Sequence, residues 1–148
     1  MNRTMFAAVL LCVIAFLLQI QFGGNGFGFE NAVLVTLIAL ACVRDVLQIV
    51  FLGIIAAWFL NWQPGVSAEV VLLVAIPVAV SLLKGIFPGL FLVSYWAAVV
   101  LGVGLWYVAA DFRLIVETPS ALMNEIALGC IWAAACIVPI RILARDSR

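Results

Sequence analysis

Residues 31–62 read NAVLVTLIALACVRDVLQIVFLGIIAAWFLNW, and the way this stretch divides decides the fold. Its only charged residues are Arg44 and Asp45, which stand next to each other near its middle. Treated as one helix, the stretch places Arg44 within a bilayer, at roughly 2.5–3.5 kcal/mol on insertion scales. Treated as two helices, it forms a hairpin with both charges in the turn. We therefore predict two helices.

The composition points to a membrane. The 148 residues are 68% hydrophobic and 9% charged, with a mean hydropathy of +1.35, whereas soluble domains are about 45–50% apolar and about 25% charged. In lipid, backbone polar groups must be satisfied internally, which leaves helices or closed barrels. Long apolar runs without alternation exclude the barrel. We expect an all-α polytopic transmembrane helical bundle that forms a single domain over residues 1–148.

Apolar runs separated by polar, glycine or proline residues predict six spans. The runs cover residues 5–22, 31–43, 46–62, 69–83, 90–110 and 121–140. A full span takes about 20 residues, so the second and fourth runs are short. The longest loops are expected at 23–30 and 111–120.

The basic residues give the orientation. With six spans and a cytoplasmic N-terminus, the cytoplasmic side carries six of the seven basic residues: Arg3, Arg44, Lys84, Arg141, Arg145 and Arg148. Arg113 alone lies outside. Fusing residues 31–62 into one span instead puts four basic residues outside and two inside, against the positive-inside rule. We predict both termini in the cytoplasm and a multi-pass protein of the bacterial cytoplasmic (inner) membrane.

The residues that usually carry catalysis are missing or scattered. The sequence has no histidine, the commonest general base and metal ligand. Its four cysteines form no CxxC pair and fall within apolar runs, where they are expected to act as small hydrophobes: Cys12, Cys42, Cys130 and Cys136. The net charge of zero gives no reason to expect nucleic-acid binding. We expect no enzyme activity, catalytic residue, cofactor or metal.

A few polar and small residues are candidates for a role. Glu125, beside Asn124, is the deepest acid; we expect a solvated carboxylate at the membrane interface, the alternative being a functional intramembrane acid. Arg44 and Asp45 are expected to stabilise their turn, the alternative being a contact for a cytoplasmic partner. Small residues such as Gly102 and Gly104, and Ala133 to Ala135 in the last run, predict close packing between helices.

Two short motifs mark the ends of neighbouring runs: Leu17-Leu18-Gln19-Ile20 at the end of the first and Asn31-Ala32-Val33-Leu34 at the start of the second. They resemble motifs of MreD, the rod-shape-determining membrane protein of bacterial cell-wall elongation. Gly53 and Gly65 have the separation of the family's recurring glycines. Ala57 stands where the family usually carries an aspartate. The likeness extends to the number, orientation and length of the spans.

The resemblance implies a non-enzymatic scaffold that organises the cell-wall elongation complex, or elongasome, and so peptidoglycan biosynthesis and cell shape. Its partners would be MreC, MreB filaments, RodA and penicillin-binding synthases. Two alternatives stay open: a small accessory subunit of a larger membrane complex, and the substrate-binding component of an energy-coupling-factor vitamin transporter. The latter needs a polar pocket, for which the candidates are Gln19, Gln21, Asn61, Gln63, Asn124 and Glu125.

Overall fold

A computed structural model describes residues 3–23, 31–60, 67–84, 91–110 and 112–145. Over these ranges the chain is helical and contains no strand, which confirms the all-α class. The helices of the described residues are α1 (Arg3–Gly23), α2 (Ala32–Ala41), α3 (Val46–Leu60), α4 (Ala68–Leu83), α5 (Phe91–Ala110), α6 (Phe112–Glu117) and α7 (Pro119–Arg145).

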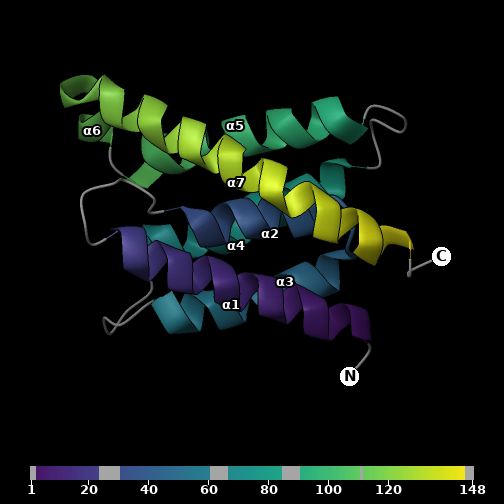
Figure 1. Cartoon of the computed structure of the whole chain (residues 1–148). Coiled ribbons are helices and arrows are strands. Elements are labelled where there is room, and N and C mark those ends of the chain that lie inside the picture. Colours follow the sequence, from purple (N-terminus) through teal and green to yellow (C-terminus); the bar gives the residue numbers. More distant parts are fainter. Residues whose placement is uncertain (1–2, 24–30, 61–66, 85–90, 111, 146–148) are drawn as a thin grey trace.

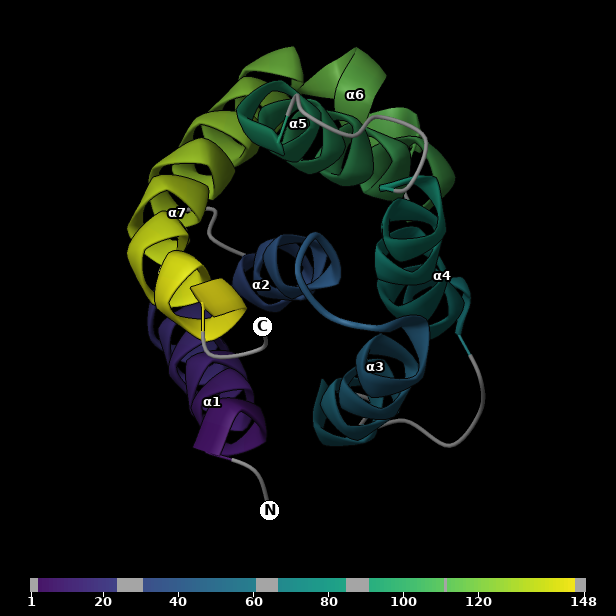
Figure 2. The same cartoon turned by 90° about the vertical axis from the view of Figure 1, so that its right-hand side faces the viewer.

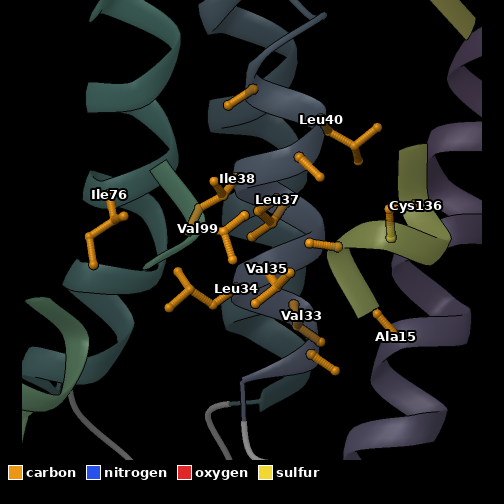
Figure 3. Close-up of a cluster of buried hydrophobic side chains, with 14 of the residues drawn as sticks. Ala15, Val33, Leu34, Val35, Leu37, Ile38, Leu40, Ile76, Val99 and Cys136 are labelled. Atoms are coloured by element: carbon orange, nitrogen blue, oxygen red, sulfur yellow. The ribbon is translucent and has the colours of Figure 1, made fainter. Parts of the chain in front are cut away.

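Helix α2 lies at the centre of the bundle. It contacts α1, α3, α4, α5 and α7, which lie around it (Figure 2). All ten of its residues are buried, with exposed fractions of 0–1%. In the close-up, Ile76 of α4 and Val99 of α5 lie on one side of α2, and Ala15 of α1 and Cys136 of α7 lie on the other (Figure 3). The core of the protein is therefore built around one helix that touches no solvent.

The predicted break between residues 31–43 and 46–62 is confirmed. Helix α2 ends at Ala41, and α3 begins at Val46. Between them the amides of Val43 and Arg44 donate hydrogen bonds to the carbonyl of Leu40 at 3.0 and 2.9 Å, which tightens the last turn of α2. Helices α2 and α3 then run in opposite directions (Figure 1).

The other predicted runs also form helices, and one loop prediction is wrong. The start of α1 and the end of α7 lie at the same end of the bundle (Figure 1). The stretch 111–120, expected to be a loop, contains α6 and the beginning of α7. Thr118 followed by Pro119 is a strong helix-start signal, since threonine is a favoured N-cap and proline is well suited to the first helical position. That signal places the start of α7 before residue 121.

Two stretches of the described residues are long and apolar enough to cross a membrane. They are Met5–Phe22 and Pro119–Ile142, with mean hydropathies of 2.4 and 1.8. Only 17% and 22% of their residues are buried, whereas the core helix of a water-soluble protein would be mostly buried. Helices α2, α3 and α4 have 10, 15 and 16 residues, and the apolar stretch Val93–Ala109 of α5 is also shorter than 18 residues. The two long stretches indicate association with a membrane.

Glycine permits the closest approach between α5 and the centre of the bundle. A Cβ added to Gly102 would lie 2.4 Å from Cδ1 of Ile38 in α2 and 3.2 Å from Cγ2 of Ile76 in α4. A Cβ on Gly104 would meet no atom within 4 Å. The expected role in close packing is thus confirmed for Gly102, while a side chain at Gly104 would meet open space.

These neighbouring glycines give a matched test of the packing. We expect Gly102→Ala to lower the free energy of unfolding by about 1–3 kcal/mol, because the fully buried Ile38 must move to admit a methyl group. Gly104→Ala should be neutral or stabilising by up to about 1 kcal/mol, because alanine favours helix. Thermal unfolding in mild detergent, followed by circular dichroism, measures both. Equal effects of the two substitutions would contradict the packing of α5 on α2.

Candidate functional site

The start of α2 is held by side chains from two other helices. Gln19 of α1 accepts a hydrogen bond from the amide of Val33 at 3.2 Å, one of the first amides of α2, which have no partner within the helix. Asn31 precedes α2 and makes no side-chain bond to its own helix. Its Nδ2 donates instead to Oε2 of Glu125 in α7 at 3.3 Å. Helices α1, α2 and α7 are thereby joined at one point.

Glu125 is buried, so the expectation of a solvated interfacial carboxylate is wrong. Its exposed fraction is 3%, equal to that of Asn31. The side chain lies on the face of α7 that packs against α2, and hydropathy alone cannot reveal which face of a helix turns inward. The carboxyl group thus lies beside the start of α2, where it accepts a hydrogen bond from the side-chain amide of Asn31. Neighbouring Asn124, by contrast, is exposed.

The end of α2 is held by α4. Nζ of Lys84 donates to the carbonyl of Ala41 at 3.3 Å and to the carbonyl of Arg44. Oγ of Ser81 donates to the same Arg44 carbonyl at 3.3 Å. The last carbonyls of a helix lack partners within it, and a cation is favoured at the negative end of the helix dipole. Lys84 therefore supplies both a hydrogen-bond donor and a positive charge at the C-terminus of α2.

The Arg44–Asp45 turn is fixed differently from the expectation. Arg44 has an exposed fraction of 7%, whereas Asp45 is exposed, so the two side chains occupy different environments. Their backbone does the holding: the Arg44 carbonyl accepts the bonds from α4, and the Asp45 carbonyl accepts from the amide of Ile49 at 3.1 Å, which starts α3. A contact between exposed Asp45 and a cytoplasmic partner stays a prediction.

Two further hydrogen bonds tie α7 to its neighbours at mid-height. Thr36 of α2 donates to the carbonyl of Ala32 at 2.8 Å and accepts from Nε1 of Trp132 at 2.8 Å. Tyr95 of α5 is fully buried and donates to the carbonyl of Ala133 at 2.6 Å. The sequence reasoning missed both. The available signal was a hydroxyl within an otherwise apolar run, which in a membrane needs a partner on another helix.

The five candidate residues do not form one site. Glu125 lies at the start of α2, and Arg44 and Asp45 follow its end. Gly53 is buried in α3, where an added Cβ would lie 3.3 Å from Cγ2 of Val74 in α4, so this glycine serves helix packing. Gly65 lies outside the described residues.

Several polar groups described above meet around α2. They bond to the backbone of α2 and its neighbours or to one another. Oε1 of Gln48 in α3 is buried without a hydrogen-bond partner among the described residues. No group of three metal-ligating side chains comes together in this part of the chain. Comparison with protein-family models, curated proteins and solved structures found no match.

Replacing Lys84 tests the hydrogen bonds that hold the C-terminal end of α2. We expect Lys84→Met to lower the free energy of unfolding by about 1–2 kcal/mol, because the carbonyl of Ala41 loses the Lys84 donor and that of Arg44 keeps only Ser81. Arg141→Met is the control, since Arg141 is an exposed cation of α7. It should change stability by less than about 0.5 kcal/mol. Unfolding by denaturant in detergent measures both, and equal losses would refute the role of Lys84.

A double-mutant cycle tests the contact between Asn31 and Glu125 at the start of α2. Glu125→Leu leaves the amide of Asn31 buried without its partner, which should cost about 1–3 kcal/mol. Asn31→Leu strands the carboxylate and should cost at least as much. The double variant removes both polar groups, so its loss should fall short of the sum by at least about 1 kcal/mol. Strict additivity would argue against the contact. Glu117→Leu on exposed α6 serves as the control for loss of an acid.

Proposed function

We propose that this chain is a six-span membrane protein with both termini in the cytoplasm that acts as a non-enzymatic scaffold. The MreD-like motifs suggest the cell-wall elongation complex of the bacterial inner membrane as the structure it organises. Its partners would then be MreC-like, RodA-like and penicillin-binding proteins. Three features of the bundle support the proposal.

The first supporting feature is the apolar perimeter. Large hydrophobic side chains are exposed on each of the helices around α2, among them Leu17 of α1, Trp58 of α3, Leu82 of α4, Leu101 of α5 and Ile131 of α7, with exposed fractions from 59% to 82%. In water such contiguous apolar surface is a liability. In lipid it is the expected exterior, and polar groups belong inside.

The second supporting feature is the alternation of the helices. Successive helices α1 to α5 reverse direction, and α7 returns to the end at which α1 begins (Figure 1). If the short helices α2, α3 and α4 each count as one crossing of the membrane, the total number of crossings is even, and both termini lie on the same side. Arg44 and Lys84 then lie at the same end of the bundle as the start of α1 and the end of α7, as the positive-inside rule requires.

The observation that carries the scaffold role is the filled axis. A substrate-binding component of a vitamin transporter has to enclose its ligand within the bundle. Here the centre is taken by α2, whose residues have exposed fractions of 0–1%. Of the residues that could have lined a pocket, Gln19 and Glu125 are bound at the start of α2. A protein with a filled core and an apolar exterior is suited to contact other proteins.

Recovery of partners tests the scaffold role. Tagged protein should be extracted from a rod-shaped bacterium in mild detergent and examined by native mass spectrometry. We expect co-purification with an MreC-like protein or a cell-wall synthase, and not with an unrelated six-helix membrane protein that carries the same tag. A lone monomer with a bound vitamin would overturn the scaffold in favour of ligand capture. Recovery with a different complex would instead assign an accessory subunit.

Cysteine labelling tests the six spans. Ser67→Cys, before α4, and a cysteine appended to the C-terminus should react with impermeant reagents from opposite sides of the membrane, in a background in which native cysteines are replaced. The same side for both would contradict six spans. Replacing the native cysteines should cost little, because none of the four forms a disulfide.

A further inference from the structure

The lipid-facing helices of the bundle differ in apolar length. Helix α5, Phe91–Ala110, contains no charged residue and rises about 30 Å, close to the hydrocarbon thickness of a typical bilayer. The apolar stretch Met5–Phe22 of α1 rises about 27 Å. Helix α4 is shorter. Charged Glu69 and Lys84 are both exposed, and the fourteen residues between them rise only about 21 Å.

Lys84 cannot lengthen α4 by reaching toward water. A lysine near the end of a transmembrane helix usually extends its side chain to the interface. Here Nζ of Lys84 is bound to the carbonyls of Ala41 and Arg44 at the end of α2. At the other end, Oγ of Ser67 caps α4 by accepting from the amide of Val70 at 3.4 Å. Both ends of α4 thus have polar groups that are bound to backbone within the bundle.

Helix α3, beside α4, repeats the short spacing. Asp45 is exposed directly before α3, and Trp58 is 82% exposed thirteen residues later, about 20 Å along the helix. Tryptophan favours the interface between lipid and water. Helices α3 and α4 contact each other and lie next to each other on the perimeter (Figure 2). Together they form a continuous edge that is short in the direction of the spans.

We propose that the α3–α4 edge thins the bilayer and is surrounded by lipids with short or disordered acyl chains. The inference rests on the proposed transmembrane arrangement. Between Glu69 and Lys84 the outward side chains of α4 are all apolar: Val71, Ala75, Ala79, Leu82 and Leu83. Tilting would shorten the reach of α4 further. The lipid must therefore adapt to a hydrocarbon layer of about 21 Å at this edge, against about 30 Å beside α5.

Stability as a function of lipid length tests the inference. The full chain is reconstituted into bilayers of dimyristoleoyl-, dioleoyl- or dierucoyl-phosphatidylcholine, and its thermal unfolding midpoint is measured. We expect the highest midpoint in the dimyristoleoyl lipid, by a margin on the order of 5 °C over the dioleoyl lipid. A midpoint that is independent of chain length, or highest in the longer lipids, overturns the proposal.

Two matched variants locate the effect. Glu69→Leu extends the apolar face of α4 by about one half-turn, or about 3 Å of a mismatch of about 9 Å, and should reduce the dependence on lipid length by roughly a third. Glu117→Leu removes an exposed acid from α6, away from the edge, and should keep the wild-type dependence. Equal behaviour of the two variants would place the short edge elsewhere and refute the assignment to α4.

Two controls separate failure of the proposed function from failure of this inference. Alkaline carbonate extraction establishes whether the chain is embedded in the membrane, and its release would refute the proposed transmembrane function itself. Embedded protein with its highest unfolding midpoint in dioleoyl lipid would refute only the proposal that the α3–α4 edge thins the bilayer. Native mass spectrometry then measures whether a second copy of the chain binds, and so covers α4. Dimers that form in dioleoyl and disappear in dimyristoleoyl lipid would show that a second copy relieves the mismatch, and would overturn the lipid proposal.

Discussion

Helix α2 is buried on all sides, and both of its ends are buried with it. Its ten residues rise about 15 Å, half the thickness of a typical hydrocarbon layer. The amides and carbonyls at its ends therefore lie inside the protein, where an unsatisfied group costs several kcal/mol. At one end Gln19 accepts from the amide of Val33, and at the other Lys84 donates to the carbonyl of Ala41. Glu125 binds the side chain of Asn31 just before α2, and Ser81 binds the carbonyl of Arg44 just after it. The remaining helices are placed so that α1, α4 and α7 can deliver these side chains.

The groups at the two ends of α2 come from different helices. Nζ of Lys84 lies at the negative end of the α2 dipole, and the carboxyl group of Glu125 lies at the opposite end, bound to the side chain of Asn31. The partners are far apart in the chain, since Asn31 and Glu125 are separated by 94 positions. Helices α1 to α4 alone could not complete the environment of α2.

The sequence predicted helices well and their neighbours poorly, for a physical reason. Runs of apolar residues mark helices whatever they pack against, and the adjacent Arg44 and Asp45 mark a break because charge is excluded from the bilayer centre. In a membrane protein, however, lipid and protein interior are both apolar, so hydropathy does not separate the central α2 from the perimeter. Glu125 is buried because it lies on the face of α7 that turns toward α2 and α1. The sequence of α7 alone does not show which of its faces turns inward. Thr36 could have been singled out as a hydroxyl in an apolar run, but its partner Trp132 lies 96 positions away.

The filled axis places recognition on the outside of the bundle. Under the proposed membrane arrangement, that outside is almost entirely apolar, and apolar side chains discriminate partners weakly by chemistry. The apolar length of the perimeter helices supplies a second basis for discriminating between partner helices. A partner helix of ordinary span matches the apolar height of α1 and α5 but would leave part of its apolar surface exposed beside α3 and α4. Under the proposed scaffold role, an uneven perimeter would favour attachment of partners at the taller side and would give the nearly uncharged bundle a defined orientation toward them.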